Sequence, residues 1–194
     1  MASILRFDNW ENSDGTSIAT SDASGNLTFA GVGAGKILQV VSTAKTDTWS
    51  GTVTVSAFSS NITGLEVTIT PTSATSQVLI ICLLHATHAS YGQANYRLVR
   101  NGSAVGVGDA AGSRPQLTSG LQPSDITANI NTPVVNMGAH YLDSPASTSA
   151  LTYGVQLYGI NPTGTMYVNR TAQDSDSVSR GRYVSTITAM EVSA

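Results

Sequence analysis

The segment Gly31–Lys36, GVGAGK, is the part of this chain closest in residue type to a phosphate-binding loop. Such a loop has the form G-x-x-x-x-G-K-[ST] and lies between a strand and a helix, whose N-terminal amides hold the phosphate. Counting back from Lys36 puts Ala30 at the first glycine position and Ile37 at the metal-binding hydroxyl. A β-forming run follows in place of a helix. We therefore interpret the segment as a flexible glycine-rich hinge.

Histidine and aspartate supply the other candidate chemistry. His85 and His88 are three residues apart, and a strand would place them on opposite faces, so we do not expect them to share a metal ion. His140 could join them only through the fold. Asp174–Ser177, DSDS, and Asp109 offer oxygens to calcium but without the spacing of a calcium loop, so solvated loops are expected. We predict no catalytic, cofactor or metal site, and a protein that is not an enzyme.

Charged side chains are scarce. Asp, Glu, Lys and Arg make up 11% of the chain, where about 25% is usual. Residues 31–194 hold eight basic and eight acidic groups. A neutral domain without a basic cluster has no electrostatic means of holding a phosphate backbone, so we expect no nucleic-acid partner. No apolar run approaches the roughly 20 residues that cross a bilayer, so we expect no membrane insertion.

Short runs of β-forming residues recur after Lys36, with turn residues between them. They are Ile37–Ser42, Thr52–Phe58, Leu65–Thr70, Gln77–Ala86, Asn95–Arg100, Ser103–Val107, Val134–Leu142, Leu151–Tyr158, Thr165–Asn169 and Tyr183–Val192. In Leu65–Thr70, apolar and polar residues alternate, which is typical of a half-buried strand. Asn101-Gly102 is a two-residue hairpin signal. The pattern predicts an all-β fold, an antiparallel, jelly-roll-like β-sandwich with an extended N-terminal arm.

The run Val78–Leu84, VLIICLL, is apolar at every position. Because successive side chains of a strand point to opposite faces, this pattern predicts a central strand that is covered on both sides. Cys82 is the one cysteine of the chain, which excludes an internal disulfide. Its neighbours indicate a small buried apolar side chain.

Residues 1–34 differ from the rest in being mostly polar, with scattered hydrophobic residues and turn signals at Ser13-Asp14-Gly15 and Ser24-Gly25-Asn26. We interpret residues 1–34 as an attachment arm that includes the hinge, and residues 35–194 as a β-sandwich knob domain. An arm of this kind would order best against another subunit or a larger assembly. The apolar side chains predicted to dock it are Ile4, Leu5, Phe7 and Trp10.

Several segments together resemble a module of tailed-phage structural proteins, especially marine ones. They are GKILQVVSTAKTDT, LEVTITPTSATSQVLI, YRLVRNGSAVGVGDAAGSR, YLDSPASTSALTYGVQLYG and MYVNRTAQDSDSVSRGRYVSTITAMEV. The resemblance covers about residues 35–194, and DGTSIATSDASGNLTFAG is similar to the segment that precedes such modules in phage fibres. Proteins of this kind are described as tail-fibre-like or virion structural proteins. This chain has no heptad or β-helical repeats for a shaft, which leaves a head-mounted or vertex-mounted knob open beside a tail fibre.

The resemblance implies a homotrimeric knob on the virion surface, made in the cytoplasm of an infected bacterium and contributing to host attachment. Its partners would be copies of itself, other virion proteins and a host surface glycan or receptor. The residues predicted for the trimer interface are Tyr153, Leu157, Tyr158, Tyr167 and Tyr183, since aromatic residues are enriched at such contacts. The same residues could equally belong to the core.

Two loops are candidates for receptor contact. One is Gly108–Pro133, a polar stretch that is longer than a connection requires and contains Asp109, Arg114 and Gln116. The other is Gln173–Arg180.

Three other functions stay open. A capsid decoration or head-fibre protein would bind the capsid and leave host adsorption unaffected. A carbohydrate-binding module would present an exposed aromatic platform, for which Trp49 and Tyr91 are candidates. An enzyme such as a depolymerase would need catalytic groups that no motif of this sequence supplies.

Overall fold

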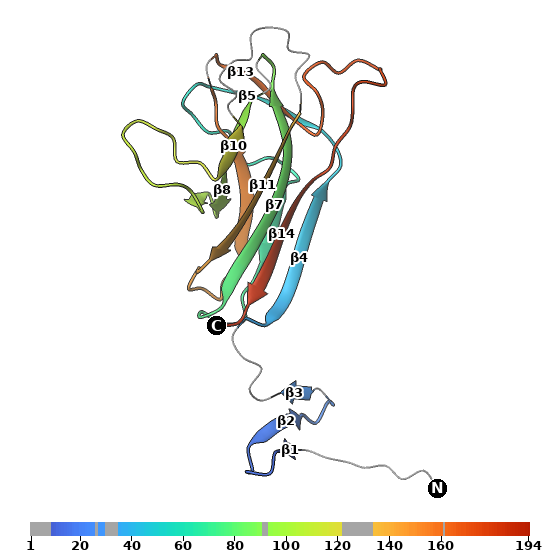
Figure 1. The fold of residues 1–194 in the computed structure, drawn as a ribbon, viewed down its shortest axis with the longest axis vertical. Coiled ribbons are helices and arrows are strands. Elements are labelled where there is room, and N and C mark those ends of the chain that lie inside the picture. The colour runs from blue at the N-terminus through green and yellow to red at the C-terminus, as the bar shows by residue number, and fades with distance from the viewer. Residues whose placement is uncertain (1–8, 26, 30–34, 91–92, 122–133, 161) are drawn as a thin grey trace. The chain divides into compact units, whose positions relative to one another are not determined.

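The computed structural model describes residues 9–25, 27–29, 35–90, 93–121, 134–160 and 162–194. The chain divides into two compact units, Met1–Lys36 and Ile37–Ala194. The secondary structure of both consists of strands and turns within the described ranges (Figure 1). None of these ranges contains a helix with the length and apolarity needed to cross a membrane.

The first unit contains three short antiparallel strands, β1 (Asn9–Glu11), β2 (Ser17–Ser21) and β3 (Leu27–Phe29), which pair in chain order. The turn between β1 and β2 is held by Asn12, whose Oδ1 accepts the amides of Asp14 at 3.0 Å and Thr16 at 2.9 Å. Short alternating runs and turn residues therefore form local hairpins. The extended arm that we expected over these residues contains this small sheet.

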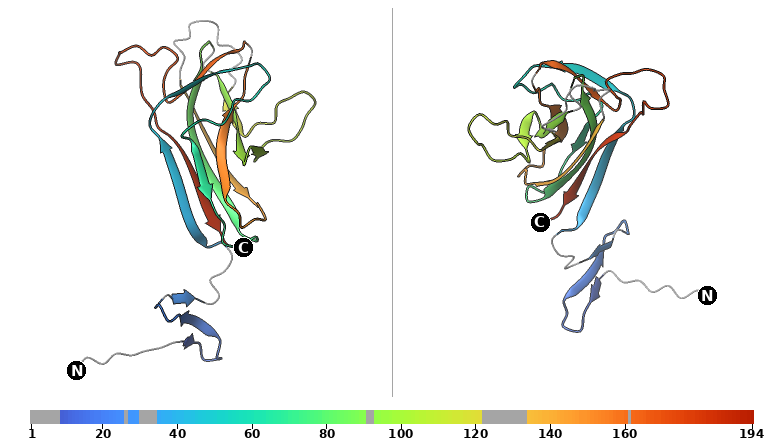
Figure 2. Two further views of the ribbon diagram at one scale, coloured as in Figure 1. Left: turned by 180° about the vertical axis from the view of Figure 1, so that it is seen from behind. Right: turned by 45° about the horizontal axis from the view of Figure 1, so that its top comes forward.

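The second unit is a sandwich of two antiparallel sheets (Figures 1 and 2). The larger sheet contains β4 (Ile37–Lys45), β5 (Trp49–Val53), β7 (Gln77–His88), β11 (Val135–Asp143), β13 (Gly164–Val168) and β14 (Ser185–Val192). Its order is β4-β14-β7-β13-β5, and β11 pairs with the other edge of β7. The smaller sheet contains β6 (Glu66–Ile69), β8 (Ala94–Arg100), β9 (Ser103–Val105), β10 (Ser119–Leu121) and β12 (Leu151–Leu157). Its order is β10-β8-β12-β6, with β9 beside β8. The predicted antiparallel β-sandwich is confirmed.

Alternation of apolar and other residues along the strands builds the core between the sheets. Residues of β7 and β14 face residues of β8 and β12, and all of these side chains have at most 2% of their surface exposed. They include Val78, Ile80, Cys82, Leu84, Ile187, Ala189, Tyr96, Leu98, Tyr153, Val155 and Leu157. Cys82 is a buried free thiol, as expected, and burial raises its pKa to about 12.

Most predicted strands are present, and the hairpin at Asn101-Gly102 has the expected positive φ angles of 48° and 83°. The strand predicted at Thr52–Phe58 has the wrong bounds, because β5 covers Trp49–Val53. The backbone leaves the strand at Thr54, where Gly159 crosses it so closely that a Cβ on the glycine would lie 1.9 Å from the Thr54 carbonyl oxygen.

Strand β10 was not predicted, because SGL has no alternating pattern. It forms through pairing with β8, where Gly120 leaves room for the Asn95 side chain.

Strand β7 is central, as its sequence predicted, but only one of its faces is covered in a single chain. Val78, Ile80, Cys82 and Leu84 are buried in the sandwich. On the opposite face Ile81 has 42% of its surface exposed, and its neighbours Leu79 and Leu83 are half-buried. The prediction of cover on both sides is therefore wrong for the isolated chain.

A buried carboxylate joins β14 to the connection between β6 and β7 near one end of the sandwich. Glu191 of β14 is fully buried, and its Oε1 accepts hydrogen bonds from the amide and the hydroxyl of Thr72, both at 2.7 Å. Its Oε2 accepts a bond of 2.7 Å from Gln39 Nε2. Burial alone would raise the pKa of this carboxyl, but hydrogen bonds from Gln39, Thr72 and Ser76 outweigh burial and lower the pKa to about 2.

Glu191 therefore makes the fold sensitive to acid. Its pKa is 4.5 in an ordinary environment and about 2 in the folded protein, so its contribution to stability is complete above pH 4.5 and is lost as the pH falls toward 2. At about 1.4 kcal/mol per pKa unit, this contribution is about 3 kcal/mol. We expect urea unfolding to show Glu191→Gln destabilised by about 2–3 kcal/mol at pH 7, with a shallower loss of stability below pH 4.5. Asp109→Asn, at an exposed loop carboxylate, is the control. An unaltered acid profile in Glu191→Gln would contradict this role.

Candidate functional site

The outward surface of the larger sheet carries a row of apolar side chains that crosses four strands. Strands β11, β7, β14 and β4 lie side by side in that order (Figure 1). Their register pairs Leu142 with Leu79, Leu79 with Met190, and Met190 with Val40. Leu142 has 44% of its surface exposed and Val40 has 55%, while Leu79 and Met190 are half-buried.

The neighbouring rows are also uncharged. Ile81 lies between His140 and Thr188, and Leu83 lies between Gly138 and Thr186. We call the surface formed by Leu38, Val40, Leu79, Ile81, Leu83, Leu142 and Met190 the apolar face. Among the described residues of these four strands, none that points outward beside it is Lys, Arg, Asp or Glu.

A contiguous apolar patch of this kind marks an interaction surface in soluble proteins. The sequence contained a signal for it in VLIICLL, whose second apolar face the sandwich does not cover.

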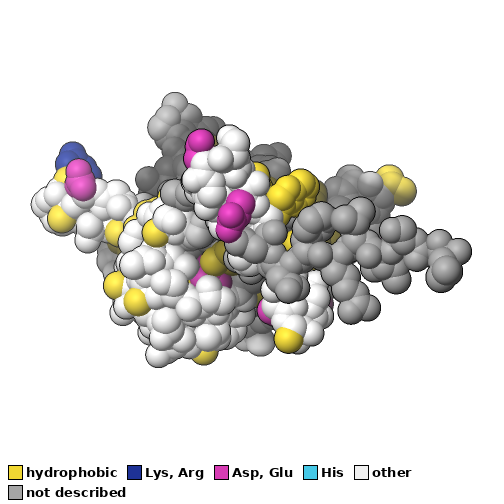
Figure 3. All heavy atoms as spheres, turned by 90° about the horizontal axis from the view of Figure 1, so that it is seen from below, with side chains coloured by type: hydrophobic (Ala, Val, Ile, Leu, Met, Phe, Trp, Pro, Cys, Tyr) yellow, Lys and Arg dark blue, Asp and Glu magenta, His cyan; other side chains and the backbone are white. Residues whose placement is uncertain are grey.

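Charged groups are sparse elsewhere as well. In the view of Figure 3, most described atoms are uncharged, and charged side chains appear only as small separate groups.

Two of the residues predicted for a trimer interface lie in the core instead. Tyr153 and Leu157 are fully buried within the chain and have no surface to offer to a second copy. They belong to β12, whose inward-facing residues pack between the sheets, so the alternative of core residues holds for both.

The other three predicted interface residues are half-buried, and each already contacts a side chain of the same chain. The Tyr158 ring lies 5.0 Å from the Phe58 ring. The Arg170 guanidinium lies 4.2 Å from the centre of the Tyr167 ring. Tyr183 stacks on His85 at 5.3 Å.

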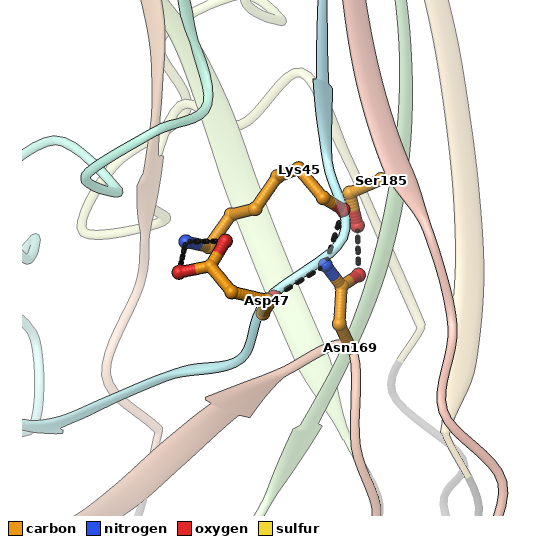
Figure 4. A network of polar contacts seen from close by, with 4 residues as sticks. All are labelled: Lys45, Asp47, Asn169 and Ser185. Carbon is orange, nitrogen blue, oxygen red and sulfur yellow. Dashed lines mark hydrogen bonds and ion pairs between the residues drawn. The ribbon is translucent and has the colours of Figure 1, made fainter.

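A second candidate surface is the loop between β13 and β14, and Asn169 fixes its base. Asn169 is fully buried and has a φ of 63°, a conformation that asparagine tolerates better than most residues. Its Nδ2 donates to the carbonyl oxygens of Lys45 at 2.7 Å and Asp47 at 2.9 Å, and its Oδ1 accepts from the Ser185 hydroxyl at 2.6 Å (Figure 4). Its amide donates to the carbonyl of His85 at 2.9 Å. One side chain thus joins the end of β4 to the start of β14, and sequence patterns gave no sign of it.

Lys45 completes this network. Its side chain is 3% exposed, and its Nζ donates to both carboxylate oxygens of Asp47, at 2.9 and 3.0 Å (Figure 4). The hydrogen bond from Lys45 lowers the pKa of Asp47.

The loop between β13 and β14 also contains a group of three ionic side chains and a pocket. Asp174 accepts Arg170 Nη1 at 2.7 Å and Arg182 Nη1 at 2.5 Å, and the hydrogen bond from Arg182 is the main reason that its pKa is lowered. A pocket of about 300 Å³ is lined by Asp174, Ser175, Asp176, Ser177, Arg180 and Arg182.

The pocket offers guanidinium and hydroxyl donors beside carboxylate acceptors, which suits a polar ligand with several hydroxyl or charged groups. Both oxygens of Asp174 are engaged by arginines, which disfavours calcium there. The described residues contain no group of three or more His, Cys, Asp and Glu side chains that could hold a metal ion.

The residues predicted for the first receptor loop are at the surface, and the two histidines of β7 lie apart. Asp109, Arg114 and Gln116 are exposed in the loop between β9 and β10, where Gln116 Nε2 donates to the Gly108 carbonyl at 2.8 Å. The end of the Gly108–Pro133 stretch lies outside the described residues. His85 and His88 point to opposite faces of β7, as predicted, with His85 half-buried and His88 buried.

Trp10 of β1 is 64% exposed, whereas Ile4, Leu5 and Phe7 lie outside the described residues. Of the two predicted sugar platforms, Tyr91 is outside them too. The ring of Trp49 lies across Gly51, where a Cβ would be 2.6 Å from it, and packs against the core. Trp49 therefore has a structural role.

The chain matches no known protein-family model, and no curated protein is detectably similar to it.

Asn169 should be essential for this end of the sandwich. Asn169→Ala removes its buried hydrogen bonds and places alanine at a positive φ, so we expect urea unfolding to show a loss of roughly 2–4 kcal/mol. Asn169→Gly tolerates the backbone angle but still lacks the side chain, and it should recover only the backbone part of that loss. The exposed Asn136→Ala is the control and should stay within about 0.5 kcal/mol. Equal stability of Asn169→Ala and Asn136→Ala would contradict this role.

Proposed function

We propose that this chain is a structural protein of a tailed-phage virion. In this proposal the unit Ile37–Ala194 is a knob on the virion surface, the N-terminal unit anchors it to the particle, and the knob contributes to host attachment as a homotrimer. The apolar face is the observation that carries the proposal, because it is a surface that a lone chain leaves in contact with water.

Burying a half-exposed Leu, Ile or Val contributes on the order of 1 kcal/mol. The apolar face has four such side chains with more than 40% of their surface exposed, Leu38, Val40, Ile81 and Leu142, together with half-buried neighbours. Covering the whole face would therefore stabilise an assembly by several kcal/mol. Because the face carries no like charges, copies of the chain can approach one another without repulsion. The number three rests on the phage-protein resemblance and not on the face itself.

Attachment is assigned to the loop between β13 and β14, which holds the pocket lined by arginine, aspartate and serine. This loop contains the predicted receptor segment Gln173–Arg180, and its base is fixed by Asn169. A rigid base under a polar pocket is what a recognition loop requires.

A capsid decoration protein remains the alternative role. The number of copies per particle separates the two roles: a few copies at the tail would favour attachment, and many copies over the head would favour decoration.

Charge on the apolar face should separate the copies without unfolding them. Val40→Lys and Leu142→Lys replace side chains that are 55% and 44% exposed in the single chain, so each chain can keep its fold. We expect sedimentation velocity to show trimers for the unchanged protein and monomers for the double variant, with the same circular dichroism spectrum. Thr68→Lys, on the outward side of the smaller sheet, should remain trimeric. A double variant that is still trimeric would place the interface elsewhere.

Removal of the first unit should abolish attachment to the particle. A chain that starts at Ile37 keeps all strands of the sandwich, so we expect it to fold as the knob. In a phage whose own copy of the gene is deleted, the full chain should appear in purified particles and the shortened chain should not, as measured by quantitative mass spectrometry. Equal amounts of both in the particles would refute anchoring through the N-terminal unit.

A further inference from the structure

The outward side of the smaller sheet carries four polar side chains linked in a line, which we call the polar row. Arg97 donates to Gln156 Oε1 from Nε at 3.0 Å and from Nη2 at 2.7 Å. Gln156 Nε2 donates to Asn61 Oδ1 at 3.0 Å, and Asn61 Nδ2 donates to Glu66 Oε1 at 2.6 Å. All four side chains are half-buried. They come from β8, β12, the segment before β6, and β6, so the fold alone brings them together.

The polar row is held in place from several sides. Gln156 of β12 is directly opposite Arg97 of β8. The glycine at position 154 leaves room for the row: a Cβ there would lie 3.1 Å from Asn61 Nδ2 and 3.2 Å from Glu66 Cγ. At the other end the Arg97 guanidinium lies 3.6 Å from the centre of the Phe58 ring. These contacts fix the direction of each planar group before any ligand arrives.

The polar row keeps hydrogen-bonding capacity that its internal bonds do not use. Gln156 and Asn61 each have two amide hydrogens and donate one within the row. Arg97 uses Nε and Nη2, which leaves Nη1, and Glu66 uses Oε1, which leaves Oε2. Donors are therefore available along the row, with an acceptor at the glutamate end.

An aromatic pair lies beside the donors. The Phe58 and Tyr158 rings are 5.0 Å apart, tilted by 56°, and both are half-exposed. Arg97, which contacts the Phe58 ring, connects the pair to the row.

We propose that the polar row and the Phe58–Tyr158 pair bind a neutral saccharide. Sugar hydroxyls both donate and accept hydrogen bonds, so they match fixed amide, guanidinium and carboxylate groups, while the C–H surface of the sugar ring packs on an aromatic ring. The charges of Arg97 and Glu66 balance, which favours a neutral ligand over an acidic one. A row that served only to make the sheet soluble would need neither the fixed orientation nor the neighbouring rings.

This site is separate from the β13–β14 loop and does not depend on the chain being a virion protein. It also differs from the sugar platforms expected at Trp49 and Tyr91. Sequence reasoning had no signal for it, because Asn61, Arg97 and Gln156 are far apart in the chain and each is an ordinary polar residue in a strand or loop.

The test is saturation-transfer NMR of the full-length protein with a panel of neutral di- and trisaccharides built from glucose, galactose, mannose and N-acetylglucosamine. We expect at least one of them to bind. For that saccharide, calorimetry should show at least tenfold weaker binding by Gln156→Ala and by Tyr158→Ala. Asn136→Ala, at an exposed amide on β11 of the larger sheet, should bind as the unchanged protein does, and Arg182→Ala tests whether the β13–β14 loop pocket is the saccharide site instead. Gln156→Glu, which conserves size and can keep the bond from Arg97, provides a second variant if Gln156→Ala does not fold.

Three results would overturn the proposal. They are no binding of any saccharide in the panel, unchanged binding by a folded Gln156 variant, and binding that is lost in Arg182→Ala but kept in Gln156→Ala. The last result would move the sugar site to the loop pocket. None of these measurements uses the phage particle, so their failure is distinct from failure of the proposed virion role.

Discussion

Strand β7 has apolar side chains on both faces, and the sandwich covers only one of them. Its inward residues, Val78, Ile80, Cys82 and Leu84, form the centre of the core. Its outward residues, Leu79, Ile81 and Leu83, continue across β11, β14 and β4 as the apolar face. The same strand thus stabilises the single chain and leaves apolar side chains exposed on the outward surface of the sheet. The absence of charged side chains from the apolar face is consistent with the proposed trimer, because covering a charged group without a partner would be costly.

Buried polar groups are concentrated where strands end. Asn169 joins the end of β13 to β4 and β14, Glu191 joins β14 to the segment before β7, and Asp143 accepts Arg100 at 2.6 Å and the Tyr153 hydroxyl at 2.7 Å. Burial, together with the hydrogen bond to Asp143, raises the pKa of Tyr153, so the phenol stays protonated as a donor. Each of these groups is satisfied by several hydrogen bonds. The middle of the sandwich can therefore remain apolar, and the loops at its ends begin from fixed positions.

The sequence was informative where physical periodicity controls the structure. Alternation and turn residues identified most strands of the sandwich, and Asn101-Gly102 identified a hairpin. The sequence VLIICLL also showed an apolar outward side, which we expected to be covered. Alternation along Leu151–Leu157 puts Tyr153 and Leu157 on one apolar face of the strand, but it does not tell whether the other sheet or a second copy covers that face. Both residues were therefore predicted at an interface although they lie in the core. Periodicity also did not predict β10, the role of Asn169 or the polar row, because these depend on contacts between residues that are far apart in the chain.

The two outward sides of the sandwich differ in chemistry, and the proposed roles follow that difference: the uncharged apolar face for other copies of the chain, the polar row for a saccharide. The central claim is that the apolar face is covered in the native protein. Hydroxyl-radical labelling of the full-length protein, read by mass spectrometry, tests it with matched residues. Leu142 and Leu121 are 44% and 49% exposed in the single chain, and Val40 and Val55 are 55% and 37% exposed. Covered side chains would leave Leu142 and Val40 labelled several-fold less than Leu121 and Val55. Labelling of each pair in proportion to these exposures would contradict the account.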